Sequence, residues 1–465
     1  MRLPSFLSRG AASPKAQLPP GPRARVPLQF VVQSSLDRLG FLQDFASYGD
    51  IAYMQGFGGL HFYMINHPEL IQDVLVTNHR AFVKSRALQV ARRLLGEGLL
   101  TSEGELHLRQ RRLVQPAFHR QRMAAYAAVM SDYAAQTAAH WSVLGSGARV
   151  DMAQEMMRLT LAIVGKTLFD ADIANEASEI GEALTESLHA VNRLLLPGGE
   201  ALEKLPLPAN QRAETARQRL DATIYRVIAE RRADGSDHGD LLSMLLAARL
   251  EDETTGAAVG MSDTQVRDEA MTLFLAGHET TANALAWTWV LLAQNPAEER
   301  RLHAELDAVL AGRTANLDDI PNLPYTRMVL SEALRLYPPA YIVGREVVEP
   351  YPLRDYVLPV GATVFISQYV MHRDPRYWFD AERFDPQRWT PEAQARRPRF
   401  SYFPFGGGPR VCIGEGFAWT EGILLLATLA QHWQARLLPG HHVQPEPLIT
   451  LRPKNGLPMT LHRRR

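Results

Sequence analysis

The chain has 465 residues with 50 basic and 50 acidic side chains, which gives a formal net charge of zero. This balance argues against a nucleic-acid-binding protein, because such proteins need a basic surplus to neutralise phosphates. With 46% hydrophobic residues the chain can bury a large core. Length alone suggests about three domains.

The N-terminal segment, residues 1–17, is short and mixed in polarity, so we expect a flexible leader there. Neither this segment nor any later stretch reaches the roughly 18 to 20 uninterrupted apolar residues of a membrane span. The proline-rich stretch Leu18–Pro22 predicts a stiff, extended entry to the folded body. We expect a cytoplasmic protein without a membrane anchor, and the single cysteine favours the same reducing compartment.

Hydrophobic spacing predicts a mainly α-helical chain with a few short strands. Strand patterns cover residues 51–54, 60–65, 343–348, 357–366 and 448–451. Helical patterns cover residues 68–75, 104–118, most of 121–250, 263–295 and 329–337. Residues 82–100 lack clear periodicity, and we expect a loop with short helical pieces there.

The helix predicted over residues 104–118 carries His107 and Arg111 four positions apart. Two basic groups at this spacing lie one turn apart on the same helix face. A solvated helix face is the ordinary interpretation of such a pair, and the two residues by themselves name no chemistry.

A long helix is predicted in the middle of the chain. The sequence from Ser262 to Gln265 forms a capping box, and the helical pattern then continues without proline to Asn295. About 33 residues at roughly 1.5 Å each span about 50 Å, enough to cross the molecule. In its middle, Ala276-Gly-His-Glu-Thr-Thr281 is poor helix sequence, since the glycine alone costs about 1 kcal/mol. The glycine either serves packing or marks an opening of the helix that makes room for a ligand.

The next predicted helix ends before Pro338 and carries Glu332 and Arg335, three positions apart. Such a pair is ordinarily a surface ion pair worth a few tenths of a kcal/mol. If the pair were buried with a further charge, losing one partner would cost several kcal/mol.

The only cysteine lies in the stretch Phe405-Gly-Gly-Gly-Pro-Arg-Val-Cys412-Ile-Gly414. Three glycines and a proline predict a tight loop with few side chains, which lets a flat group approach the backbone. An apolar helical pattern follows, so Cys412 is expected at a helix N-terminus, where free N–H groups favour a thiolate. The alternative is a small buried residue, the commoner fate of a free cysteine.

This cysteine loop resembles the haem-binding signature of the cytochrome P450 superfamily, the haem-thiolate monooxygenases. The helix with His107, the Ala276–Thr281 stretch, the Glu332 helix and the cysteine loop also occur in the order that this family shows. The resemblance implies one catalytic domain over residues 18–465, similar to soluble bacterial members, and replaces the expectation of three domains. The implied fold is mainly α with small β-sheets, with a long central helix over haem b and the cysteine loop beneath it.

The resemblance also implies roles for individual residues. Cys412 would be the metal ligand, and Thr280 with Glu279 would be the catalytic pair that relays protons during oxygen activation. The other haem-binding positions would be Phe405, Gly408, Arg410, Gly414, His107, Arg111, Arg345, Ala276 and Gly277. The substrate would be lined by Phe274, Ala276, Ala340, Tyr341, Ile342, Ile449 and Thr450. A buried structural cluster would join Glu332, Arg335 and Arg383.

The function implied is insertion of one oxygen atom of O2 into a C–H bond of an apolar substrate such as a fatty acid, terpenoid or carotenoid-like chain. Electrons would come from a separate ferredoxin or flavodoxin with its NAD(P)H-dependent reductase. Basic residues near the cysteine side, Arg109, Arg112, Arg120 and Arg122, would recruit an acidic donor, although they also fit a solvated face. The alternatives are a peroxide-driven peroxygenase, an isomerase or a non-catalytic haem-thiolate sensor, and the acid–threonine pair argues against all three.

Overall fold

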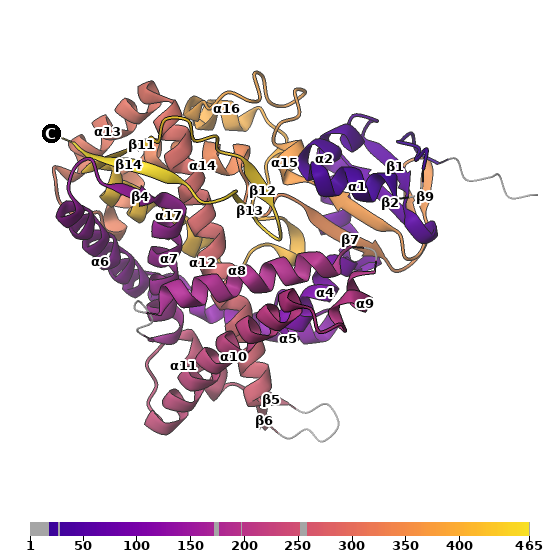
Figure 1. The fold of residues 1–465 in the computed structure, drawn as a ribbon, viewed down its shortest axis with the longest axis horizontal. Coiled ribbons are helices and arrows are strands. Elements are labelled where there is room, and N and C mark those ends of the chain that lie inside the picture. The colour runs from indigo at the N-terminus through magenta and orange to yellow at the C-terminus, as the bar shows by residue number, and fades with distance from the viewer. Residues whose placement is uncertain (1–17, 27, 172–175, 197, 252–257, 465) are drawn as a thin grey trace, which may run out of the picture.

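The computed structural model describes residues 18–26, 28–171, 176–196, 198–251 and 258–464, so the leader expected over residues 1–17 lies outside the described residues. The fold is mainly α-helical with small sheets, as expected (Figure 1). The helices are α1 (Gln29–Leu36), α2 (Arg38–Ala46), α3 (Pro68–Gln72), α4 (Arg86–Leu95), α5 (Gly104–Val114), α6 (Arg120–Leu144), α7 (Met152–Phe169), α8 (Ala177–Leu194), α9 (Gly199–Glu203), α10 (Pro208–Asp234), α11 (Leu241–Ala247), α12 (Asp263–Gln294), α13 (Pro296–Leu310), α14 (Pro324–Leu336), α15 (Gln368–Met371), α16 (Pro391–Ala395) and α17 (Glu415–Ala430). The strands are β1 (Ile51–Gln55), β2 (His61–Ile65), β3 (Phe82–Lys84), β4 (Arg149–Asp151), β5 (Arg249–Glu251), β6 (Ala258–Gly260), β7 (Val343–Val347), β8 (Tyr351–Leu353), β9 (Tyr356–Leu358), β10 (Thr363–Ile366), β11 (Trp433–Leu437), β12 (Pro445–Pro447), β13 (Leu451–Pro453) and β14 (Pro458–Arg463).

The largest sheet has five strands in the order β1-β2-β10-β7-β3 and forms one end of the molecule together with α1 and α2 (Figure 1, right). β1 and β2 are antiparallel, with Tyr53 opposite Tyr63, which confirms the predicted strand pair. The proline-rich entry lies along β1, because the Tyr53 N–H donates to the Pro20 carbonyl at 2.9 Å. A second sheet, β11-β14-β4, ties the C-terminal strands to the start of α7.

α12 is the central element, and its 32 residues cross the molecule (Figure 1). The predicted capping box is present, since Ser262 Oγ accepts from the Gln265 N–H at 3.2 Å and the Gln265 side chain accepts from the Ser262 N–H at 2.9 Å. Most of α12 is buried, and it packs along α7 and against α10, α14 and α17. Within the described ranges, no helix is long and apolar enough to cross a membrane.

The structure corrects three local predictions. Residues 82–100 contain β3 and the ten-residue helix α4, in which Leu94 and Leu95 are buried against the main core. The single strand expected over residues 357–366 is two strands, β9 and β10, because Gly361 turns the chain with φ 79°. The strand expected over residues 448–451 begins only at Leu451, where β13 pairs with β12, because residues 448–450 form a bend.

Candidate active site

α12 opens onto an internal space at one place. Ala276 is exposed although Leu275 and His278 beside it are buried, while Gly277 and Thr280 are half-buried. An exposed alanine in the middle of a buried helix indicates a cavity next to it. The structure therefore places Ala276, Gly277 and Thr280 on the same open face of the helix.

The structure also decides why a glycine stands in this helix. α12 stays α-helical through Gly277, so the hydrogen-bond ladder does not open there. A Cβ at Gly277 would lie 3.0 Å from Val164 of α7, and the glycine thus lets the two helices pack closely. The Thr280 hydroxyl donates to the Ala276 carbonyl at 2.8 Å, within the same turn.

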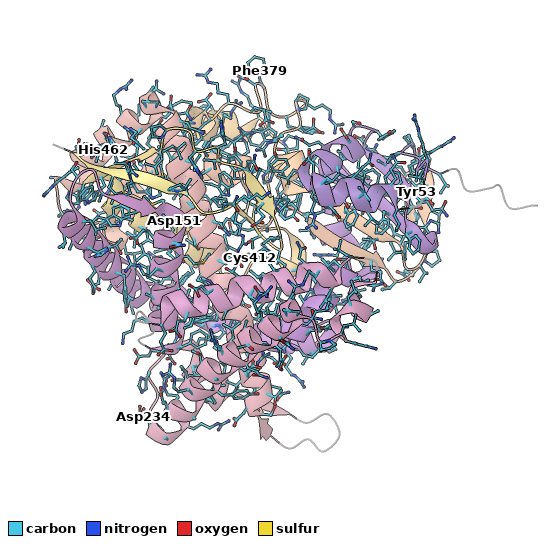
Figure 2. All side chains as sticks on the ribbon, viewed as in Figure 1. Tyr53, Asp151, Asp234, Phe379, Cys412 and His462 are labelled. Atoms are coloured by element: carbon cyan, nitrogen blue, oxygen red, sulfur yellow. The ribbon has the colours of Figure 1, made fainter. Side chains whose placement is uncertain are left out.

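The cysteine loop is held in a shape that requires glycine. The Cys412 N–H donates to the Phe405 carbonyl at 3.0 Å and closes the loop. Gly406 and Gly408 have φ angles of 75° and 70°, and a Cβ at Gly408 would lie 1.9 Å from the Leu75 carbonyl oxygen. Only glycine adopts this backbone at no steric cost. Figure 2 shows Cys412 near the middle of the molecule.

The thiol of Cys412 lies deep in the protein but retains exposed surface, so it faces an internal space. α17 begins at Glu415 with Gly414 as its N-cap residue, so Cys412 lies close to the helix N-terminus, as predicted, but two residues before the cap. Burial nevertheless raises the pKa of Cys412, while the Gly414 N–H and the charge of Arg111 act in the opposite direction. Without a bound ligand, burial raises the pKa of the thiol more than the N–H group at the start of the helix lowers it. A bound metal cation reverses this balance, because a coordinating thiol is deprotonated.

A cluster of cations lies beside this space. Arg410 pairs with Glu103 and donates to the Ser102 carbonyl at 2.9 Å. Burial, reinforced by Arg410, lowers the pKa of Lys84 to about 7 and that of Arg345 to about 10. Lys84 and Glu103 were not among the predicted residues, and no sequence pattern marks them. Arg410, Lys84 and Arg345 carry more positive charge than Glu103 carries negative charge, so this cluster is net positive.

Two members of the cluster have unused hydrogen-bonding groups. His107 is buried, its Nδ1 contacts the Leu99 carbonyl at 3.1 Å, and its Nε2 lacks a partner among the described residues. Among the described residues, Arg345 uses one donor, Nη1, which donates to the carbonyl of its neighbour Gly344 at 3.1 Å. Burial lowers the pKa of His107 to about 3, so its imidazole is neutral. A di-acid such as the propionates of haem would use these donors and cations.

Arg111 contacts the cysteine loop directly. Its Nη1 donates to the Val411 carbonyl at 2.9 Å, directly before the cysteine, so it holds the loop in place. The remaining N–H groups of its guanidinium stay available to a carboxylate. Taken together, the open face of α12, the thiol and the surplus of cations fit a haem group.

The side chains of the predicted catalytic pair, Glu279 and Thr280, point in different directions. Glu279 is buried, and its Oε1 accepts from the Thr450 hydroxyl at 2.6 Å. Burial raises the pKa of Glu279, against the effects of the Thr450 hydrogen bond and the charge of Arg452. Thr280 faces the internal space and Glu279 faces the C-terminal segment, because neighbours in a helix point about 100° apart.

The predicted substrate-lining residues divide into two groups. Ala340 is exposed, and Ile342 and Ile449 are half-buried. Phe274 is 3% exposed and packs on Phe169 of α7. It lies two positions before Ala276, so its side chain points about 200° around the helix axis from that of Ala276. The following positions also lie away from the open space: Tyr341, whose hydroxyl donates to the Leu448 carbonyl at 2.9 Å, and Thr450, which is engaged with Glu279.

The buried ionic cluster exists, but its third member was predicted wrongly. Glu332 and Arg335 are 0% exposed and pair at 2.8 Å. The second arginine on Glu332 is Arg388, with Nε at 3.3 Å, whereas Arg383 is exposed and offers only its carbonyl to Arg335. Arg388 directly precedes Trp389, whose indole also donates to Glu332, and the sequence alone does not show which of the two arginines reaches this carboxylate.

Comparison with known proteins agrees with this geometry. Residues 19–458 match the family model described as Cytochrome P450. The chain belongs to the cytochrome P450 family. Similar relatives include cyclooctatin synthase of Streptomyces melanosporofaciens, 43% identical over 89% of each chain, and pentalenene oxygenase of Streptomyces avermitilis, 37% identical over 89% of this chain and 90% of the relative. The crystal structure of the cytochrome P450DA heme domain has a TM-score of 0.83 at 26% identity, with 96% of this chain and 98% of that chain covered.

This P450 is an oxidoreductase that incorporates oxygen from O2, and its cofactor is haem b. When bound, the haem activates dioxygen, and a cysteine thiolate ligand favours O–O cleavage. The P450's own residues would hold the group: Cys412 through its sulfur, and Arg345, Arg410 and His107 through hydrogen bonds to the carboxylates.

Proposed function

We propose that this P450 inserts one oxygen atom of O2 into a C–H bond of an apolar terpenoid, with electrons from a separate donor protein. The observation that carries the proposal is the similarity to relatives that oxidise terpenoids. Besides the two relatives above, cyclooctat-9-en-7-ol 5-monooxygenase of Streptomyces melanosporofaciens is 38% identical over 86% of each chain. Three relatives of this kind favour a terpenoid over a fatty acid or a carotenoid-like chain.

The accessible residues among those expected to line the substrate support an apolar substrate. Ala340, Ile342 and Ile449 have accessible surface, and none of them is charged. Burying an unpaired carboxylate or amine among such residues costs several kcal/mol. Affinity should instead grow with the apolar area of the ligand, by about 25 cal/mol for each Å² removed from water.

The proton supply is assigned to Thr280 and Glu279. Thr280 places its hydroxyl at the open face, where a bound oxygen molecule would be within its reach. Glu279 accepts a hydrogen bond from Thr450, and burial raises its pKa, which favours the protonated form more than in an exposed carboxyl. A change of side-chain rotamer or a water molecule would have to connect the two groups.

The donor is proposed to bind through basic residues near the cysteine side. Arg112 and Arg120 are exposed, Arg109 and Arg122 are half-buried, and none of the four forms an ion pair with another described residue. Exposed charges of this kind raise the association rate of an acidic partner and are screened over about 10 Å at 0.1 M salt. The rate of reduction by a ferredoxin should therefore fall as salt is added.

The proposed substrate class is tested by spin-state titration of the haem-loaded protein. The ligand set contains cyclic terpene hydrocarbons, their mono-alcohols, long-chain fatty acids and glycosylated macrolides. We expect the terpenoids to bind most tightly and to yield hydroxylated products with O2, NADPH and a ferredoxin system. Tight binding of glycosylated compounds alone contradicts the proposal, and turnover that needs only hydrogen peroxide identifies a peroxygenase.

A further inference from the structure

The charge of His107 depends on which of its ring nitrogens carries a proton. Its Nδ1 lies 3.1 Å from the Leu99 carbonyl oxygen. A carbonyl oxygen can only accept a hydrogen bond, so Nδ1 carries a proton. Burial and the neighbouring cations lower the pKa of His107 to about 3, so at neutral pH the chain alone leaves Nε2 as an unprotonated acceptor.

The carbonyl that fixes this tautomer is itself held from three elements. The Leu99 N–H donates to Glu269 Oε2 of α12 at 3.1 Å, and Lys84 Nζ of β3 donates to the Leu99 carbonyl at 3.2 Å. His107 of α5 and Glu269 are 3% and 0% exposed. Because buried side chains of α5, α12 and β3 all hold Leu99, the fold favours the tautomer with the proton on Nδ1.

In this state Nε2 does not match a carboxylate. The atom is buried and has no hydrogen-bond partner among the described residues. A lone pair facing a carboxylate oxygen repels it, because both groups only accept hydrogen bonds. A second proton on Nε2 of His107 replaces this repulsion by a charge-assisted hydrogen bond.

The charges around this imidazole explain why the second proton is absent without a ligand. Arg410, Lys84 and Arg111 all act against a charged ring. Glu103 pairs with Arg410, and burial raises the pKa of Glu269 to about 7, so the two carboxyls do not neutralise the three cations. The two carboxylates of a haem reverse this balance. The proton then stays on the imidazole, since a free imidazole has a pKa of about 6.5 and a free carboxyl group one of about 4.3.

We propose that one proton enters the site with haem, and that His107 is an imidazolium in the haem-bound protein, with Nδ1–H on Leu99 and Nε2–H on a haem carboxylate. The proton comes from water, and no covalent bond of the chain or the haem forms or breaks. Neither property depends on the substrate class proposed above. Because a proton enters with the haem, the contribution of His107 to haem affinity should fall about tenfold for each pH unit between pH 6 and pH 8.

The charge of His107 is measured on the haem-loaded protein, labelled with ¹⁵N-histidine and held as the diamagnetic ferrous carbon monoxide complex. Nitrogen NMR distinguishes protonated from unprotonated ring nitrogens. We expect both nitrogens of His107 to be protonated at pH 6, 7 and 8, with its signals assigned by their loss in His107→Gln.

His278 is the internal control in the same spectra. It is 1% exposed, its Nδ1 lies 2.7 Å from the Phe274 carbonyl, and burial lowers its pKa to about 4. Its tautomer is thus fixed in the same way, but it lies outside the cation cluster. His278 should stay neutral at all three pH values, with its signals assigned by their loss in His278→Gln.

A second measurement tests the proton count. Haem is partitioned at equilibrium between the protein and apomyoglobin, at pH 6 and at pH 8, for the unsubstituted protein and for His107→Gln. The glutamine offers an amide N–H that does not titrate, so groups that titrate in both proteins cancel in the ratio of their affinities. The affinity of the unsubstituted protein relative to the variant should fall about hundredfold from pH 6 to pH 8.

Two results overturn the proposal. One is an unprotonated Nε2 of His107 in the haem-bound protein at pH 7, which assigns this nitrogen to a donor such as an arginine N–H. The other is an equal pH dependence of haem affinity in the two proteins. If His107→Gln does not retain haem, neutron diffraction from crystals of the unsubstituted haem-bound protein decides the question. Deuterons on both ring nitrogens of His107 support the proposal, and a deuteron on Nδ1 alone overturns it.

Discussion

Replacing Glu332 by alanine should destabilise the protein more than any other change in its ionic cluster. The carboxylate is 0% exposed and accepts from Arg335 Nε and Nη2 at 2.8 Å each. It also accepts from the Asp385 N–H and the Trp389 indole at 3.0 Å each, and Arg388 Nε lies 3.3 Å away. One deletion therefore removes the acceptor for several buried donors at once.

The expected cost is about 3 to 5 kcal/mol, because the substitution leaves the buried charge of Arg335 without its counter-ion. Carbonyls of His372, Ala381 and Arg383 still accept from Arg335 at 2.9, 2.7 and 3.1 Å, so part of its hydrogen bonding survives. Each additional orphaned donor costs about 1 to 3 kcal/mol where it cannot relax toward water.

Urea unfolding of Glu332→Ala, Arg388→Ala and Arg383→Ala tests this assignment. The loss of stability should decrease in that order, and Arg383→Ala should stay within about 0.5 kcal/mol, because an exposed side chain is removed and its carbonyl remains. The carbon monoxide spectrum measures the correctly folded, haem-bound fraction in parallel. If Arg383→Ala were as damaging as Arg388→Ala, the cluster has been assigned wrongly.

Three further predictions concern Cys412, Thr280 and Glu421, a fully buried residue of α17. Cys412→Ser should lose the red-shifted absorption of the reduced carbon monoxide complex, and a surviving band contradicts sulfur ligation. Thr280→Ala should still bind haem but release more hydrogen peroxide per product, whereas unchanged coupling assigns proton delivery to another group. Burial raises the pKa of Glu421 to about 8, above its usual 4.5, so the folded chain binds this proton more tightly than the unfolded chain and stability falls as pH rises between those values. Glu421→Gln should reduce this fall, as measured by urea midpoints at about pH 5 and pH 8, and an identical pH dependence contradicts it.

The main features of this fold could be predicted from sequence because they depend on local chemistry. Ser262 and Gln265 form a capping box from residues only three positions apart, and Gly406 and Gly408 of the cysteine loop have backbone angles that other residues avoid. The stretch from Phe405 to Cys412 predicted the tight cysteine loop and carried the resemblance to the cytochrome P450 family. Such signals need no knowledge of distant contacts.

The errors arise where a role depends on residues far apart in the chain. Arg383 and Arg388 both follow Glu332 by about fifty positions, and only the path of the chain decides which guanidinium reaches the carboxylate. Lys84 joins the cation cluster because β3 pairs with β7 and places it opposite Arg345. Phe274 is a different case, since helix geometry alone directs it away from Ala276.

The cation cluster and the thiol point to one energetic conclusion. Without a ligand, Lys84 and Arg345 repel each other's charge and that of Arg410, and burial opposes the charged forms of all three. Burial likewise opposes the thiolate of Cys412. A group with two carboxylates and a central metal cation removes both penalties together, since each carboxylate meets the cations and the metal stabilises the thiolate. These buried charges therefore destabilise the haem-free protein, and haem binding relieves that cost. Cofactor binding is thereby coupled to the stability of the fold.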